Sequence, residues 1–329
     1  MECHWQRSAS HMGQPTIPPT PSGTDLSNKT VIVTGGNAGM GYEAARQLLV
    51  LHASRVIIAV RSAVKGEEAV ASLKLDPEVK KHNPTATIEA FVLDLDDYKS
   101  GLSFAQKVKQ EVKELDILLC NGGVNIMKYQ KSVAGHERVM QGWSTECTNK
   151  HATSKLRNAP THLTFVGSAT QTMHTLAKKP VAASETVLGH FDDQNIYSGL
   201  TRYSDSKLAV NAYVRRLSAL VSPSEVIVNN LCPGLVATGF DKQLPAWLKP
   251  LMFVYRKIAA RDVHEGSRTL VYASAVADAT THGKFLQSNK IDPGAPFLDQ
   301  PAGKTFTDKL WAETVIDIAR FDENLKVYA

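Results

Sequence analysis

The sequence is poor in cysteine and has no long apolar run. Its 329 residues include four cysteines, and no two of them have the C-x-x-C spacing of a redox or zinc motif. Two of them lie at apparent strand ends, where a buried and reduced thiol is expected. This favours a reducing compartment, and we predict a cytoplasmic protein. No apolar stretch approaches the ~20 residues of a membrane-spanning helix, so we predict no membrane span. The eleven histidines show no metal-ligand spacing, and we predict no metal.

A strong charge of one sign is also lacking. The formal net charge is +5 at pH 7, and the basic residues stand in scattered pairs at 80–81, 178–179 and 215–216 rather than in a stripe. Scattered pairs are typical of solvated faces, so we predict no nucleic-acid partner.

The first 25 residues differ in composition from the rest of the chain. They lack the apolar core of a signal peptide. They hold four prolines: Pro15, Pro18, Pro19 and Pro21. We predict a disordered leader over residues 1–25. With 43% apolar residues in the whole chain, residues 26–329 are long enough to bury the core of a single domain.

Short apolar runs alternate with helical patterns through residues 26–329. The runs, rich in Val, Ile and Leu, are Thr30–Thr34, Arg55–Val60, Thr87–Leu93, Asp116–Cys120, Leu163–Gly167, Val226–Leu231 and Gly283–Leu286. The helical patterns are Gly41–Leu51, Val64–Leu75, Asp97–Val112, Tyr203–Leu220 and Val263–Ala275. Apolar strands of this kind are covered on both faces in parallel sheets. The alternation therefore predicts an α/β fold with a doubly wound parallel sheet of about seven strands.

A glycine-rich turn follows the first apolar run. Residues 34–41 read T-G-G-N-A-G-M-G and lead directly into the first helical pattern. Glycines let the backbone approach a pyrophosphate, and a helix N-terminus offers free N–H groups to the phosphates. On its own such a turn is a weak signal of a dinucleotide cradle. The candidate cofactor-binding residues in it are Gly35, Asn37, Gly39, Met40 and Gly41.

Tyr203 and Lys207 form the second motif, Y-x-x-x-K. Residues four apart on a helix lie on one face, one turn apart. A free tyrosine has a pKa of about 10, too high for acid–base work near neutrality, and a neighbouring ammonium group lowers that pKa. The pair alone is also compatible with an ordinary exposed helix pair, and the glycine turn upstream favours catalysis.

Together, the glycine turn and Y-x-x-x-K resemble the short-chain dehydrogenase/reductase family, over about residues 30–287. Further matches follow in the expected order: Asp94-Leu95, Cys120-Asn121-Gly122-Gly123, Ser168 and Pro233–Thr238. Cys120 departs from the family pattern, which has asparagine there. The chain is most similar to the retinol-dehydrogenase-like branch and its fungal secondary-metabolism relatives. The resemblance implies a Rossmann fold and an oxidoreductase that interconverts a carbonyl and a secondary alcohol.

The resemblance also implies a role for each matched residue. Tyr203 would exchange a proton with the substrate oxygen, Lys207 would hold the nicotinamide ribose, and Ser168 would steady the carbonyl or alcohol. Thr170 offers a neighbouring hydroxyl as the alternative to Ser168. The remaining cofactor-binding candidates are Asp94 on the adenine side, Asn121 and Gly122 at the adenosine ribose, and Pro233, Val236 and Thr238 in the motif after the sixth run, with Thr238 at the nicotinamide carboxamide.

Arg61 is the candidate that selects the cofactor. It follows the second apolar run, 20 residues after Gly41, where an acidic residue would bind the ribose hydroxyl of NAD. An arginine there can donate two parallel hydrogen bonds to a 2′-phosphate. We therefore predict NADP(H) over NAD(H); an exposed arginine with no ligand is the alternative.

Two segments are expected to lie near the substrate. Residues 170–201 must loop out if Ser168 and Tyr203 are to meet, either over the site entrance or as a passive surface loop. Residues 239–260 correspond to the family's substrate-covering segment, and their apolar and aromatic composition favours a hydrophobic small-molecule substrate. Weak membrane-surface contact and core packing are the other interpretations of residues 245–255.

The segment 141–160 departs from the family pattern. A crossover helix is required there, yet the segment has little apolar periodicity. The family's relay asparagine is replaced by Trp143, and an altered exon or reading frame over Gly142–Ala159 would explain both features. The same helix usually forms much of the family's dimer interface, so the sequence leaves homodimerisation open. The alternative function is an NADP(H)-binding protein with impaired or absent catalysis, acting as a sensor or interaction partner.

Overall fold

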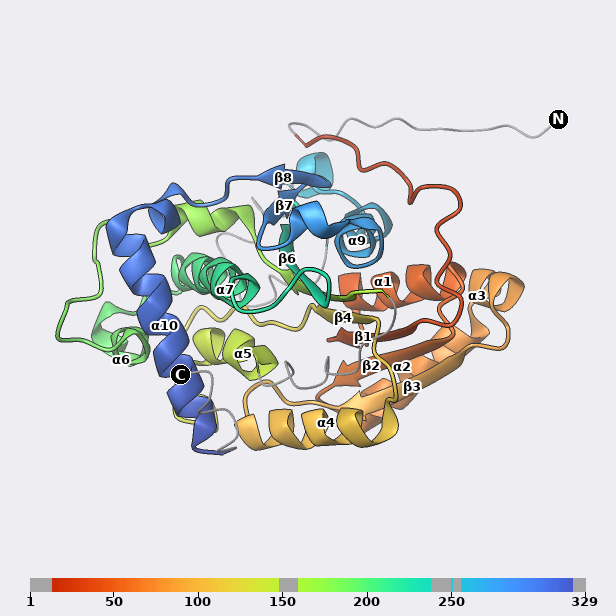
Figure 1. The fold of residues 1–329 in the computed structure, drawn as a ribbon, viewed down its shortest axis with the longest axis horizontal. Coiled ribbons are helices and arrows are strands. Elements are labelled where there is room, and N and C mark those ends of the chain that lie inside the picture. The colour runs from red at the N-terminus through yellow and green to blue at the C-terminus, as the bar shows by residue number, and fades with distance from the viewer. Residues whose placement is uncertain (1–13, 148–158, 238–249, 251–255, 322–329) are drawn as a thin grey trace.

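The computed structural model describes residues 14–147, 159–237, 250 and 256–321, and its centre is one eight-stranded sheet (Figure 1). The strand order is β3-β2-β1-β4-β5-β6-β7-β8. The strands are β1 Thr30–Thr34, β2 Arg55–Val60, β3 Thr87–Val92, β4 Ile117–Cys120, β5 Thr161–Val166, β6 Val226–Cys232, β7 Phe285–Gln287 and β8 Lys290–Asp292. All pairings are parallel except that of β7 with β8.

The predicted doubly wound fold is confirmed, with one strand more than expected. The seven predicted runs correspond to β1–β7, with differences of one or two residues at several ends. The additional strand, β8, pairs with β7 through a hairpin in which Ser288 and Asn289 both have positive φ. Asparagine tolerates this left-handed backbone better than most residues. Because β8 has only three residues, it leaves little periodic signal in the sequence.

Helices cover both faces of the sheet (Figure 1). The face with Val31 and Val33 packs on α1 Gly39–Val50, α2 Ala63–Leu75, α3 Pro77–His82 and α9 Val263–Val271. The face with Ile32 packs on α4 Tyr98–Glu111, α5 Arg138–Cys147, α7 Arg202–Ser218 and α10 Pro301–Ala319. Neighbouring residues of β1 thus enter opposite cores, as expected for a strand buried on both sides. The pieces of helix that sequence reasoning omitted are α3, α6 Val187–Asp192 and α10.

Residues 14–25 of the predicted leader are described, and they contact the folded domain. Ile17 is fully buried, and its N–H donates to Glu265 Oε1 at 2.8 Å. Prolines disfavour regular helix and strand, but they do not prevent an extended segment from packing against a folded body. Residues 1–13 lie outside the described part of the chain.

The crossover segment begins as a helix, α5, although residues 141–160 show little apolar periodicity in the sequence. Its first turn contributes Val139 and Met140 to the buried residues. Position 143 falls within α5, but its side chain and residues 148–158 are outside those described.

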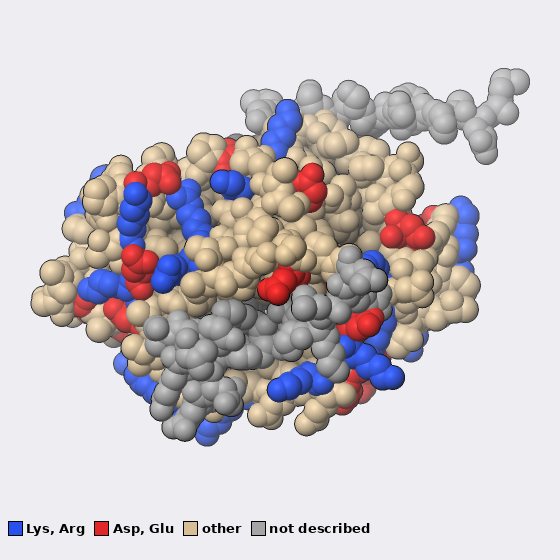
Figure 2. Space-filling model, in the orientation of Figure 1, with Lys and Arg blue, Asp and Glu red and all other residues tan. Residues whose placement is uncertain are grey.

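Within the described ranges, no helix is long and apolar enough to cross a membrane. On the face drawn in Figure 2, lysine and arginine are interspersed with acidic residues and form no continuous stripe.

Candidate active site

Two adjoining cavities lie at the carboxyl ends of the central strands. The larger, of about 900 Å³, is lined by residues that follow β1, β4, β5 and β6 and by the start of α7. The smaller, of about 260 Å³, lies at the ends of β1, β2 and β3. Gly35, Asn37, Gly122 and Gly123 line both. The strand order changes direction between β1 and β4, and this is where doubly wound sheets bind ligands.

The glycine turn connects β1 to α1 at the junction of the two cavities. Gly35 and Gly39 have φ of 65° and 57°, a backbone region that side chains with a Cβ disfavour. Ala38 is the N-cap of α1 and makes no side-chain hydrogen bond to the helix. The N–H groups of the first turn therefore face the cavity without a side-chain cap, and they fit the phosphates of a dinucleotide.

Asn121 fixes the turn relative to β4. Its Nδ2 donates to the Thr34 carbonyl at 2.9 Å, while the Asn121 and Gly122 N–H groups donate to Thr34 Oγ1 at 2.9 and 2.8 Å. A Cβ at position 41 would overlap the Asn121 amide, so Gly41 lets the helix approach this closely. The register of β4 with β5 continues through Cys120, the position that departs from the family pattern.

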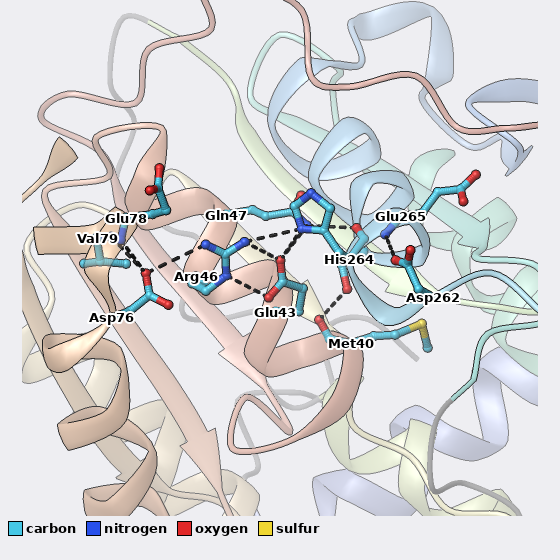
Figure 3. Close-up of polar contacts among 11 residues, drawn as sticks. Met40, Glu43, Arg46, Gln47, Asp76, Glu78, Val79, Asp262, His264 and Glu265 are labelled. Carbon is cyan, nitrogen blue, oxygen red and sulfur yellow. Dashed lines mark hydrogen bonds and ion pairs between the residues drawn. The ribbon is translucent and has the colours of Figure 1, made fainter. Parts of the chain in front are cut away.

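A polar cluster holds α1 against α9 (Figure 3). Glu43 accepts hydrogen bonds from Arg46 at 2.7 and 2.8 Å and lies 2.7 Å from His264 Nδ1. Burial of the Glu43 carboxyl opposes its ionisation, but these bonds outweigh burial and lower its pKa. The Ser267 hydroxyl donates to the Met40 carbonyl at 3.1 Å. These contacts connect the first two turns of α1 to α9, outside the cavity.

Tyr203 and Lys207 lie on one face of α7, as predicted, and line the larger cavity. The Lys207 ammonium is 5.4 Å from the centre of the Tyr203 ring and donates to the Val166 carbonyl at 2.7 Å. Because Val166 ends β5, this bond ties the lysine to the strand that precedes Ser168.

Ser168 and Thr170 both line the same cavity. Ser168 Oγ accepts from the Thr170 N–H at 3.2 Å and from Thr170 Oγ1 at 3.0 Å. A hydroxyl that accepts these bonds keeps its own hydrogen for donation. The Thr170 hydroxyl hydrogen is thus engaged, and that of Ser168 is available to a ligand oxygen in the cavity.

A buried ion pair precedes Tyr203, and no motif in the sequence pointed to it. Arg202 is 2% exposed, and its Nε lies 3.7 Å from Oε2 of the fully buried Glu137. The guanidinium also stacks over the rings of Phe191 and Tyr197, 4.8 and 5.3 Å from their centres. Burial raises the pKa of Glu137, and Arg202 opposes that rise. The start of α7, and with it Tyr203, is therefore fixed to the segment that opens α5.

Arg61 and Lys65 place two cationic side chains at the smaller cavity. Arg61 is exposed, with Nη1 3.9 Å from Asp96 Oδ2. Ser62 caps α2 by accepting from the Lys65 N–H at 3.4 Å. Asp94 lines the same cavity. Sequence reasoning missed Ser62 and Lys65, although a serine before a helix start is a recognisable N-cap signal.

Every predicted site residue in the described part of the chain lines one of the two cavities. Thr238 lies outside the described residues. Among the amide and guanidinium side chains that line the larger cavity, those of Gln14, Asn125, Arg256 and Gln287 were not predicted. In the described ranges, no group of His, Cys, Asp and Glu is placed to hold a metal ion.

The fold and the site define a dinucleotide-binding protein, and comparisons with known proteins identify its family. The sequence profile described as short chain dehydrogenase matches residues 29–148 and 193–249. The short chain dehydrogenase sor7 of Hypocrea jecorina is 56% identical over 87% of this chain and 82% of that protein. The short-chain dehydrogenase/reductase tropG of Talaromyces stipitatus is 36% identical over 93% of this chain and 96% of that protein.

Solved structures share the fold at low sequence identity. The NADPH-dependent 3-quinuclidinone reductase from Rhodotorula rubra is 19% identical, covers 85% of this chain and 97% of its own, and superposes with a TM-score of 0.59. The RhlG/NADP complex of Pseudomonas aeruginosa is 20% identical with a TM-score of 0.57, over 80% of this chain and 96% of its own. The chain belongs to the short-chain dehydrogenase/reductase family, whose members are oxidoreductases that use nicotinamide cofactors.

Proposed function

We propose that this chain is an NADP(H)-dependent oxidoreductase that interconverts a carbonyl and a secondary alcohol on a hydrophobic small molecule. The observation that carries the proposal is the meeting of Ser168, Tyr203 and Lys207 with the glycine turn in one cavity. The proposal includes a cytoplasmic location, which rests on cysteine usage. It also includes a role in fungal secondary metabolism, which rests on the fungal relatives.

The nicotinamide ring, when bound, supplies or accepts the hydride. The residues of the chain account for the proton and for orientation. Ser168 donates a hydrogen bond to the substrate oxygen, and the Tyr203 hydroxyl gives that oxygen a proton in the reductive direction. Lys207 stabilises the phenolate that remains. Two of these groups are held by contacts outside the substrate: Ser168 by Thr170 and Lys207 by the Val166 carbonyl.

The preference for NADP(H) rests on Arg61 and Lys65 at the smaller cavity. A charged hydrogen bond to a 2′-phosphate contributes about 1.5–3 kcal/mol, or about one to two decades in affinity. Arg61→Ala should therefore weaken NADPH binding about 10- to 100-fold and change NADH binding little. Fluorescence titration with both cofactors measures this, with Lys304→Ala, an exposed lysine on α10, as the matched control. Equal losses for the two cofactors would show that Arg61 is structural.

The walls of the larger cavity near Tyr203 favour a hydrophobic substrate. Several of them are apolar: Val166, Ala169, Leu235 and Val236. A panel of ketones and secondary alcohols, followed by NADPH absorbance, tests the substrate class. Turnover of bulky apolar ketones and not of small polar ones is the expected result. Turnover of polar substrates alone would contradict it.

A cofactor-binding protein with impaired catalysis is the second candidate. Tryptophan at position 143, where the family has its relay asparagine, is the observation that favours it. Replacing residues 142–159 with an apolar helix that carries the asparagine separates the two candidates. If the chain as given already turns over carbonyls with NADPH, the second candidate is excluded. If it binds NADPH and only the replaced chain turns over, the second candidate is correct.

A further inference from the structure

The side chain of Gln14 reaches into the larger cavity from the leader. Its Nε2 donates to the carbonyls of Leu235 and Ala259, at 3.2 and 2.6 Å. Its Oε1 accepts from the Leu235 N–H at 2.9 Å. One amide side chain thus satisfies both backbone groups of Leu235, which lines the cavity after β6, and joins them to a residue 24 positions later.

The leader is held in this place by several contacts of its own. The buried guanidinium of Arg261 donates to the Pro15 carbonyl at 2.7 Å and to the Pro233 carbonyl at 2.7 Å. The Ile17 N–H donates to Glu265, and Arg268 donates to the Ile17 carbonyl at 3.1 Å. These bonds connect the leader to the cavity wall at Pro233 and to α9.

Leu235 precedes the segment 239–260 that the sequence predicts to cover the substrate, and Ala259 lies near the end of that segment. Next to Gln14, the Arg261 N–H donates to the Leu235 carbonyl and the Ala237 N–H donates to the Arg261 carbonyl, both at 2.9 Å. The backbone at 235–237 therefore lies beside the backbone at Arg261. Gln14 bridges these two stretches through Leu235 and Ala259.

We propose that Gln14 is a positioning residue for the active site: it fixes the Leu235 backbone, and with it the wall formed by Pro233 and Val236, at the end of the cavity where substrate and nicotinamide bind. Gly234 lies close to the same two side chains: its φ is +80°, and a Cβ there would overlap Gln14 and Arg261. The cavity wall at Gly234 and the leader at Gln14 are therefore in close contact. This inference rests on the proposed function of the same cavity.

Kinetics of Gln14→Ala and Gln14→Glu test the inference. Glutamate has almost the same size and still accepts from the Leu235 N–H, but it cannot donate to the two carbonyls when ionised. Both variants lose two donated hydrogen bonds, so we expect substrate KM to rise about ten-fold in each. We expect NADPH affinity to change less than about three-fold, because Arg61 and the glycine turn are untouched. Thr16→Ala, an exposed position in the same segment, is the control and should match the wild type.

The outcomes separate this inference from the proposed function. If the wild type turns over no carbonyl with NADPH, the proposed function fails. The positioning role of Gln14 is then tested by the fluorescence of bound NADPH, which Gln14→Ala should alter and Thr16→Ala should not. If the wild type is active and both Gln14 variants keep its KM, kcat and NADPH fluorescence, Gln14 is not a positioning residue. If activity falls only in proportion to the fraction of protein that still binds NADPH, Gln14 is merely structural, and the inference is also wrong.

Discussion

His136 should make the stability of this protein decrease with rising pH. The imidazole lies between two carboxylates, with Nδ1 2.7 Å from Asp192 and Nε2 2.8 Å from Asp317. The hydrogen bond with Asp192, followed by that with Asp317, raises the pKa of His136 to about 9. Asp192 ends α6 and Asp317 belongs to α10, so the protonated ring joins these two helices to the start of α5.

The sign and the magnitude follow from this pKa. Between the unfolded value of 6.5 and about 9, the folded state holds one proton more than the unfolded state. The free energy of unfolding therefore falls by about 1.4 kcal/mol per pH unit over this range. Across these 2.5 pH units the free energy of unfolding falls by about 3 kcal/mol in total. Solvent screens this contribution little, because the His136 side chain is only 17% exposed. Below pH 6.5 the contribution is fully present.

Urea denaturation at pH 6 and at pH 9, for the wild type and His136→Ala, measures the effect. The variant should be less stable than the wild type at pH 6, and the difference should shrink by about 3 kcal/mol at pH 9. His82→Ala, on the surface of α3, is the control and should keep the wild-type pH dependence. A wild type and a His136→Ala variant with the same pH dependence would refute the argument, because the ring would then not be charged in the folded state.

Two further predictions concern α10 and the cavity hydroxyls. Trp311 is 4% exposed and stacks on Tyr213 with ring centres 5.1 Å apart, so Trp311→Ala should cost about 3–5 kcal/mol of stability. Thermal unfolding measures this loss. A loss below about 1 kcal/mol would show that α10 does not contribute to the core. Ser168→Ala should lower kcat more than Thr170→Val and leave NADPH affinity unchanged, because only Ser168 keeps a hydrogen for the substrate; the reverse order in steady-state kinetics would assign the role to Thr170.

The strands and the glycine turn were predictable from the sequence because their signals are local. The ends of β1 and β2 agree with the predicted Thr30–Thr34 and Arg55–Val60, since each strand is a continuous apolar run bounded by polar or glycine residues. The spacing of Tyr203 and Lys207 likewise fixes their common face once a helix is assumed.

Contacts between distant segments were not predictable in this way. The positions of Gln14 and Ile17 depend on Leu235, Ala259 and Glu265, more than 220 residues away, and proline content alone indicated disorder. The pairing of Arg202 with Glu137 and the position of His136 between two helices are also long-range. The buried residues of α10, such as Phe306, Leu310 and Ile318, lie beyond residue 287, where the resemblance to the family ends.

Turnover by Tyr203→Phe, measured together with NADPH binding, tests the central claim most directly. The variant removes one hydroxyl group and leaves the ring, Lys207 and the glycine turn in place. We predict that it binds NADPH with nearly wild-type affinity and loses carbonyl reduction to the limit of detection. Retained reduction at a rate comparable to the wild type would contradict the assignment of Tyr203 as the acid, and with it the proposed mechanism.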